Sequence, residues 1–175
     1  GSSAGASRAA CFAQKNPVAA IERLAKNYSE TVYSDKAQPE EITTKGRVLL
    51  DTVFGASGAA EIMNNEVFKA HFIVAKCNGF VASEKKVMQG LGLLMSLMRN
   101  IVRRSLINGQ YERFVFQHKS SQLSFHDPDN ISTTRVAFTE ENIKDALLAS
   151  GSIPMVMQGI RDIEGCPNGM YRDGG

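Results

Sequence analysis

The sequence predicts an α/β fold of three layers, in which helices cover both faces of one sheet. Helical and strand-like segments take turns along the chain rather than forming separate blocks, which favours a sheet packed between helices. The chain of 175 residues has 43% apolar and 22% charged residues, which are ordinary values for a globular protein with one sizeable core. We therefore expect a single domain over residues 1–175.

The first third of the chain is predicted to be helical. Residues 6–14 are rich in alanine, the best helix former. Asn16 and Pro17 supply an N-cap and a first-turn proline for a second helix that extends to about Tyr28. Apolar residues return at helical spacing over residues 40–55, which predicts a third helix.

The strands are predicted in the middle of the chain. Residues 68–76 combine aromatic and β-branched side chains and end at an asparagine-glycine turn, as a buried strand does. Shorter strands are predicted at residues 113–118 and 133–138, on either side of a polar loop. A helix is predicted at residues 140–148.

The long amphipathic helix predicted at residues 83–104 has two interpretations. Its leucines and methionines recur at three- and four-residue spacing, and core packing against the sheet is the simpler explanation. The alternative is a lipid-facing segment in which Arg99, Arg103 and Arg104 meet lipid phosphates. Burial of the methionines against the sheet would exclude this alternative.

The first five residues carry a candidate nucleophile. Gly1-Ser2-Ser3-Ala4-Gly5 fits the pattern G-x-S-x-G, in which the central serine sits on a strained turn between a strand and a helix. Glycines flank such a serine because a tight elbow leaves little room for side chains. Ser3 is thus the candidate nucleophile, and the Ala4 N–H at the helix start is a candidate oxyanion donor.

Two further motifs lie near the other end of the chain. Residues 149–154 have the sequence A-S-G-S-I-P, and residues 171–175 have the sequence Y-R-D-G-G. With the elbow, they resemble the patatin-like phospholipase family, in which a D-G-G or D-G-A turn carries the second catalytic residue. The motifs occur in the family's order and span the chain, although residues 80–135 match no family motif. The resemblance implies a patatin-like α/β fold.

The resemblance also implies a serine-aspartate dyad without histidine. Ser3 would attack an ester carbonyl, and Asp173 would take its proton and later activate the water that releases the acyl group. Gly174 and Gly175 would form the turn that supports the base. The implied activity is that of a phospholipase A or lysophospholipase, with a lipid or lysophospholipid substrate and neither a metal nor an organic cofactor.

The family pattern also includes a glycine-rich loop, G-G-G-x-x-G, that precedes the elbow and supplies further oxyanion donors. This chain starts at the elbow, so we expect a catalytic domain truncated at both ends and without that loop. Loss of one oxyanion donor costs roughly a hundredfold to a thousandfold in rate. The alternative function is therefore a non-catalytic lipid-binding or interaction module of the same fold.

A Ser-His-Asp triad is a third hypothesis, and it would make His71, His118 or His126 essential. It is disfavoured because the histidine of α/β-hydrolases follows the acid in the chain, and none follows Asp173. His71, inside a predicted strand, is expected to be structural.

Charge and cysteine content limit the partners. A net charge of +2 gives no field that would favour nucleic acid. Cys11, Cys77 and Cys166 are odd in number and far apart, which favours neither disulfides nor a zinc site and suggests a reducing compartment. The longest apolar run, residues 91–98, is far shorter than the roughly 20 residues of a membrane-spanning helix. We expect a cytoplasmic or peripheral membrane location.

Overall fold

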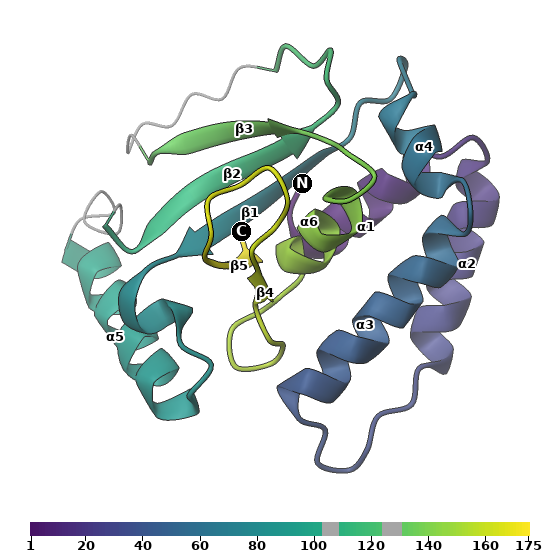
Figure 1. Ribbon diagram of the computed structural model, residues 1–175. Helices are drawn as coiled ribbons and strands as arrows, with labels where there is room; N and C mark the ends of the chain where they lie inside the picture. Colours follow the sequence, from purple (N-terminus) through teal and green to yellow (C-terminus); the bar gives the residue numbers. More distant parts are fainter. Residues whose placement is uncertain (103–108, 124–130) are drawn as a thin grey trace.

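The computed structural model describes residues 1–102, 109–123 and 131–175. Strands within these ranges form one mixed five-stranded sheet in the order β3-β2-β1-β5-β4 (Figure 1). They are β1 (His71–Cys77), β2 (Tyr111–Gln117), β3 (Thr133–Ala137), β4 (Ile160–Arg161) and β5 (Met170–Asp173). β3 pairs with β2 in parallel, and the other neighbours are antiparallel. The predicted α/β class is confirmed.

Most helices lie beside one another on one side of this sheet (Figure 1). They are α1 (Ser3–Phe12), α2 (Pro17–Glu30), α3 (Pro39–Phe54), α4 (Gly58–Met63) and α6 (Ile143–Ser150). α1 and α6 contact β1, and α2 and α3 pack against each other and join the sheet layer through α1 and α6. α5 (Lys86–Val102) packs chiefly on the short 3₁₀ helix η1 (Gly79–Ala82), near the end of β1.

The predicted start of the second helix is confirmed at its cap, whereas α1 begins at Ser3, three residues before its predicted start. The Asn16 side chain accepts a hydrogen bond from the Ala19 N–H at 3.1 Å, and Pro17 stands at the first helical position of α2. Pro39 has the same place in α3. The sequence did not predict α4, because six residues are too few to show a helical period.

The core lies between the sheet and the layer of α1 and α6. Phe72 and Val74 of β1 are fully buried, and the Phe72 ring stacks at a tilt on Phe138 with 4.8 Å between centroids. The buried face of α1 carries only Ala6, Ala10 and Cys11, so this helix can approach β1 closely. Cys11 is fully buried and packs there as a small hydrophobe.

Among the described residues, no helix is both long enough and apolar enough to cross a membrane. Arg103, Arg104 and His126 lie outside the described residues, so the structure does not test the predictions made for them.

Candidate active site

Ser3 occupies a sharp turn between an extended residue and a helix. Gly1 is bonded to β1 as a parallel strand would be: its nitrogen donates to the His71 carbonyl at 2.8 Å, and its carbonyl accepts from the Ile73 N–H at 3.0 Å. Ser2 is extended, and Ser3 then has a φ of 51° as the first residue of α1. A left-handed backbone at a non-glycine residue is strained, and strain at such a turn is what the G-x-S-x-G pattern predicts for its central serine.

The two elbow glycines differ in how tightly they are packed. A Cβ on Gly1 would lie 3.0 Å from the Gly5 carbonyl carbon, so a side chain there would press against the start of α1. A Cβ on Gly5 would have no atom of the described residues within 4 Å. The steric reason given for glycine at the elbow is confirmed for Gly1 and is wrong for Gly5.

The first turn of α1 leaves a backbone donor beside Ser3. The Ser2 carbonyl accepts from the N–H groups of Gly5 at 3.0 Å and Ala6 at 3.2 Å. Within the described residues, Ala4 N–H has no hydrogen-bond acceptor, and the first turn has no acidic side chain. This end of the helix therefore offers an N–H and the positive end of its dipole to a developing anion.

Asp173 is the last residue of β5, which pairs with the second half of β1. Its backbone pairs with Val74, and its N–H donates to the Ser152 carbonyl at 3.3 Å. One side-chain oxygen, Oδ1, accepts from the Gly175 N–H at 3.0 Å, so the carboxylate caps its own turn. The carboxylate is held at the end of a strand, beside the turn of Gly174 and Gly175.

The turn after Asp173 brings the two ends of the chain together. A Cβ on Gly174 would lie 2.9 Å from the carbonyl carbon and oxygen of Ile73, the residue whose N–H binds Gly1. A Cβ on Gly175 would lie 2.6 Å from the Ser2 Oγ and 3.3 Å from the Asp173 Oδ1. Both predicted catalytic motifs therefore lie along the same edge of β1.

The segments that carry Ser3 and Asp173 lie side by side, through Ser2 and Gly175, but the two candidate residues are not hydrogen-bonded to each other. No hydrogen bond joins their side chains within the described part of the chain, and the hydroxyl beside Gly175 is that of Ser2. The second oxygen of Asp173, Oδ2, accepts no hydrogen bond from any described residue. One carboxylate oxygen is thus fixed by the turn while the other is unengaged.

The A-S-G-S-I-P segment fastens these parts to one another. The Ser150 hydroxyl donates to the Ile73 carbonyl at 2.8 Å, and the Ser152 hydroxyl donates to the Leu148 carbonyl at 2.8 Å. Both serines are fully buried. Through the Ser152 carbonyl the segment also holds the Asp173 N–H, so it connects the centre of β1 to the end of β5.

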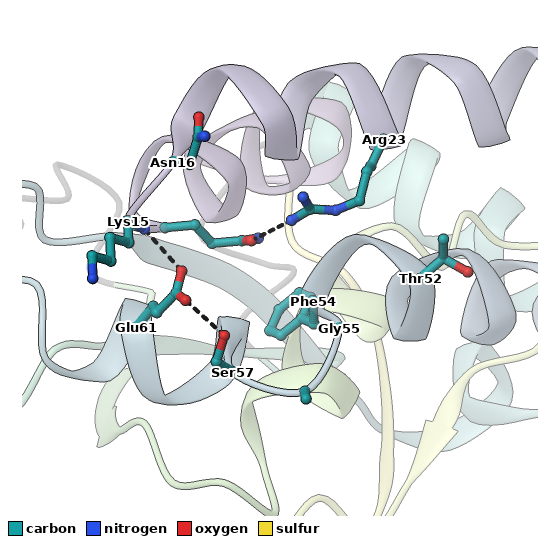
Figure 2. Close-up of a pocket in the computed structure, with 10 residues that line it drawn as sticks. Lys15, Asn16, Arg23, Thr52, Phe54, Gly55, Ser57 and Glu61 are labelled. Atoms are coloured by element: carbon teal, nitrogen blue, oxygen red, sulfur yellow. Dashed lines mark hydrogen bonds between the residues drawn. The ribbon is translucent and has the colours of Figure 1, made fainter.

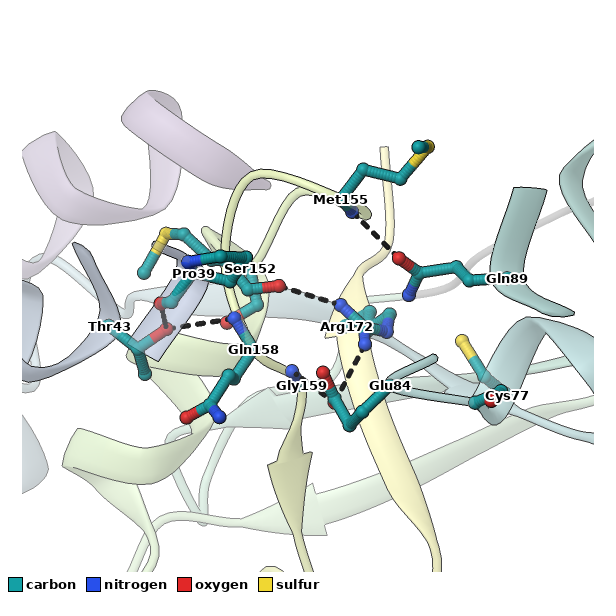
Figure 3. Close-up of polar contacts among 12 residues, drawn as sticks. Pro39, Thr43, Cys77, Glu84, Gln89, Ser152, Met155, Gln158, Gly159 and Arg172 are labelled. Carbon is teal, nitrogen blue, oxygen red and sulfur yellow. Dashed lines mark hydrogen bonds and ion pairs between the residues drawn. The ribbon is translucent and has the colours of Figure 1, made fainter. Parts of the chain in front are cut away.

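Sequence reasoning missed Arg172, the residue beside the predicted base. Its side chain is 1% exposed, and its guanidinium donates to the Met157 carbonyl at 2.9 Å and to Glu84 Oε1 at 2.8 Å (Figure 3). Glu84 also accepts from the Gly159 N–H at 3.0 Å. A cation directly before the D-G-G turn was the available signal, but its partner lies 88 residues away in sequence.

The described histidines make hydrogen bonds away from Ser3. His71 Nε2 lies 2.6 Å from the Ser121 hydroxyl, and burial lowers the pKa of this imidazole, with a further contribution from the Gly1 amino group. His118 is fully buried, and its Nδ1 accepts from the Ser120 N–H at 3.1 Å. Neither is hydrogen-bonded to Ser3, so no described histidine is paired with the candidate nucleophile.

One cavity lies at the opposite end of α1 from Ser3. It has a volume of about 620 Å³ and is lined by residues between Gln14 and Glu61 (Figure 2). The ten residues of α1 rise about 15 Å, which separates this cavity from the elbow. Its polar groups bond mainly to one another: Arg23 donates to Gln14, and Glu61 accepts from Lys15 N–H and the Ser57 hydroxyl. The arrangement joins α1, α2, α3 and α4 and is structural.

Among the described residues, no cluster of three or more histidine, cysteine, aspartate or glutamate side chains could hold a metal ion.

A family model described as patatin-like phospholipase matches residues 1–175. No curated protein and no solved structure matches the chain. The α/β sheet is consistent with this match over the whole chain, and the chain belongs to the patatin-like phospholipase family. Membership indicates lipid acyl hydrolase activity in the broad sense, with lipids as substrates.

Proposed function

We propose that this chain is a serine-aspartate acyl hydrolase that cleaves carboxylic esters of phospholipids or lysophospholipids. The observation that carries the proposal is the strained backbone of Ser3, with a φ of 51°, at the start of a helix whose first turn leaves Ala4 N–H unpaired. Strain of about 1–3 kcal/mol persists where the surrounding fold maintains it, and such residues cluster at active sites. The Asp173 turn lies at the same edge of β1.

The reaction would proceed by acyl transfer in two steps. Ser3 Oγ attacks the ester carbonyl carbon while its proton passes to Asp173, and the tetrahedral oxyanion is stabilised by Ala4 N–H and the α1 dipole. Collapse breaks the bond to the alcohol, which takes the proton back from Asp173. A water then attacks the acyl-Ser3 ester with Asp173 as base, which releases the fatty acid and restores Ser3.

The free oxygen of Asp173 supports its role as the base. Oδ1 is occupied by the Gly175 N–H at 3.0 Å, which fixes the carboxylate, while Oδ2 accepts no hydrogen bond from the described residues. A side-chain rotation of Ser3 or Asp173 is still needed before the proton can pass between them. Hydrogen bonds of catalytic groups are often long in unliganded structures and tighten when substrate binds.

Covalent labelling with a fluorophosphonate tests the nucleophile. We expect wild type to be labelled at Ser3, Ser3→Ala to lose labelling, and Asp173→Asn to lose it by a hundredfold or more, since general base catalysis contributes about 10²–10⁴-fold. Ser2→Ala is the matched control, because Ser2 is the neighbouring serine and its side chain makes no capping hydrogen bond. Labelling that follows Ser2 instead of Ser3 would sink the assignment.

A non-catalytic lipid-binding module of the same fold is the second candidate. The absence of a Ser3–Asp173 hydrogen bond among the described residues favours it. This module predicts a folded protein that binds lipid, while its Ser3 reacts with fluorophosphonate no faster than an ordinary surface serine.

A further inference from the structure

Helix α5 exposes an apolar stripe along its length. Five side chains at spacings of four, three, four and four residues lie on one face of the helix and are between 47% and 83% exposed: Val87, Leu91, Leu94, Met98 and Val102. The stripe extends over 16 residues, or about 22 Å between its ends at a rise of 1.5 Å per residue. The expectation that the helix packs its apolar residues into the core is wrong for this stripe.

The opposite face of α5 is small and polar, and it is the face that contacts the protein. Gln89 is 3% exposed and accepts from the Met155 N–H at 2.9 Å (Figure 3). Gly92 is packed so closely on η1 that a Cβ would lie 2.6 Å from the Val81 nitrogen. The Ser96 hydroxyl lies 3.1 Å from the Tyr111 hydroxyl. Glycine and hydrogen-bonding groups thus attach the helix to the domain.

This orientation is the reverse of an ordinary surface helix. Such a helix turns its apolar stripe to the core and its polar face to water. Here specific hydrogen bonds and the close Gly92 contact fix the helix with Leu91 and Leu94 outward. A contiguous exposed apolar surface of this kind marks a contact with another apolar phase or molecule.

The charges around the stripe are basic, and they favour an anionic lipid surface as the binding partner of the stripe. α5 contains no aspartate or glutamate. The exposed Lys85 and Lys86 stand at its start, and Arg99 lies beside the stripe, one residue past Met98. A helix with an apolar face flanked by lysine and arginine is suited to lie in a bilayer interface, where the cations meet lipid phosphates.

The stripe is coupled to the candidate active site by the turn that follows α6. Ile153, Met155 and Val156 of this turn are each about half exposed, at 46% to 47%. Met155 is bonded to Gln89 of α5, and Ser152, at the base of the turn, holds the Asp173 N–H. A bilayer contacting α5 is therefore connected through one short segment to the base.

We propose that α5 docks this protein on anionic bilayers. The apolar stripe would lie at the boundary between the lipid headgroups and the acyl chains; it consists of Val87, Leu91, Leu94, Met98 and Val102. The inference deepens the proposed function, because it names the surface on which that hydrolase meets its substrate. Docking needs no catalysis and can be measured apart from it.

Vesicle co-sedimentation tests the docking. Wild type is mixed with vesicles of phosphatidylcholine alone or with about one-third phosphatidylserine, at low and high salt. We expect stronger binding to the anionic vesicles, weakened by salt as screening requires. Leu94→Asp should lower the partition coefficient about tenfold or more, because a charge replaces a leucine worth roughly that factor on burial. Lys85→Gln with Lys86→Gln should lower binding to anionic vesicles several-fold.

The matched control is Val48→Asp, which makes the same kind of change at a 61% exposed position of α3. It should leave vesicle binding unchanged. Circular dichroism confirms that each variant is folded, and fluorophosphonate labelling of Ser3 in the absence of vesicles should be the same in wild type, Leu94→Asp and Val48→Asp.

Three results would overturn the proposal. They are no binding of wild type to either vesicle, equal binding by Leu94→Asp and wild type, or a wild-type dimer in sedimentation velocity that Leu94→Asp dissociates without any vesicle binding. Ser3 labelling in any of these cases would leave the proposed function standing. Vesicle binding that depends on Leu94 in a protein whose Ser3 does not label would support docking and reject the hydrolase.

Discussion

Single residues with unusual backbone geometry define the candidate site. Ser3 keeps a φ of 51°, which costs about 1–3 kcal/mol in a residue that bears a side chain. The fold maintains this conformation by fixing Gly1 on β1 and starting α1 immediately afterwards. Gly174 lies at the same edge of β1, where only a hydrogen atom fits between its Cα and Ile73.

Gly174→Ala tests how closely the Asp173 turn must approach β1. Its Cβ would lie 2.9 Å from the Ile73 backbone, which is paired in the middle of the sheet and cannot yield easily. We expect a loss of about 1–3 kcal/mol in the free energy of unfolding, measured by urea titration, and weaker labelling of Ser3. In the control Gly151→Ala, the nearest atoms are 3.7 Å and 4.0 Å from the new Cβ. Equal stability of both variants would refute the tight approach.

The sequence predicted the roles of some residues in the candidate site but not the surroundings of others. Ser3 and Asp173 were predicted from their motifs because G-x-S-x-G and D-G-G are local patterns. The partner of Arg172 was not predicted, because Glu84 is 88 residues away and no local pattern connects them. The openness around Gly5 was also unpredictable, since it depends on what the fold places beside the elbow.

At the scale of elements, the packing of α5 depends on Gly92, although glycine in a helix interior lowers helix stability. Gly92 allows the helix to lie against Val81 of η1, whereas Gly90, half a turn away, has open space around it. The two positions make a matched pair inside one helix.

We expect Gly92→Ala to lower the stability of the protein, and Gly90→Ala to leave it unchanged or raise it. A Cβ at position 92 would clash at 2.6 Å with a backbone nitrogen and should cost about 1–3 kcal/mol or displace α5. Alanine at position 90 should be neutral or stabilise by about 0.5–1 kcal/mol through its higher helix propensity. Thermal unfolding and protease cleavage within α5 would measure both effects, and a neutral Gly92→Ala would contradict the close packing.

The Arg172–Glu84 ion pair joins β5 to the segment before α5. Glu84→Gln should leave the buried guanidinium without its counter-charge and lower the free energy of unfolding by about 1–3 kcal/mol. The value is set below that of a fully buried pair, because the Glu84 side chain is 34% exposed. Urea unfolding measures it. The control is Glu30→Gln at an exposed, unpaired position of α2; an equally small effect in both variants would show that the pair contributes little.

At the scale of the whole molecule, alkaline pH should weaken the fold through its buried thiols. Burial raises the pKa of Cys77 to about 12 and that of Cys166 to about 11, and it also raises the pKa of Cys11. Unfolded thiols ionise near pH 8.5. Between that pH and the folded pKa the unfolded state loses protons that the native state keeps, so stability falls as pH rises.

Urea unfolding at pH 8, 9 and 10 measures this dependence. We expect stability to decline from pH 8 to pH 10, with a shallower decline in Cys77→Ala, whose level at pH 8 serves as its own reference. Cys77 is the more informative residue because it is 4% exposed, whereas the partly exposed Cys166 is screened by water. An unchanged slope in Cys77→Ala would assign the alkaline loss to other groups, such as Tyr171, whose pKa burial also raises.

The sequence by itself determined the α/β class, the helices that begin at Pro17 and Pro39, the longer strands and the order of the three motifs. The helices and strands depend on caps, prolines and periodicity, which act over a few residues, and the motifs are local patterns of residues. Only the tertiary structure decided the pairing of Gly1 and β5 along one edge of β1, the ion pair of Arg172 and the outward face of α5. β4 and β5, with two and four residues, are too short to show a strand period. Periodicity shows that a helix has an apolar face, but contacts between distant residues decide whether that face is turned inward or outward.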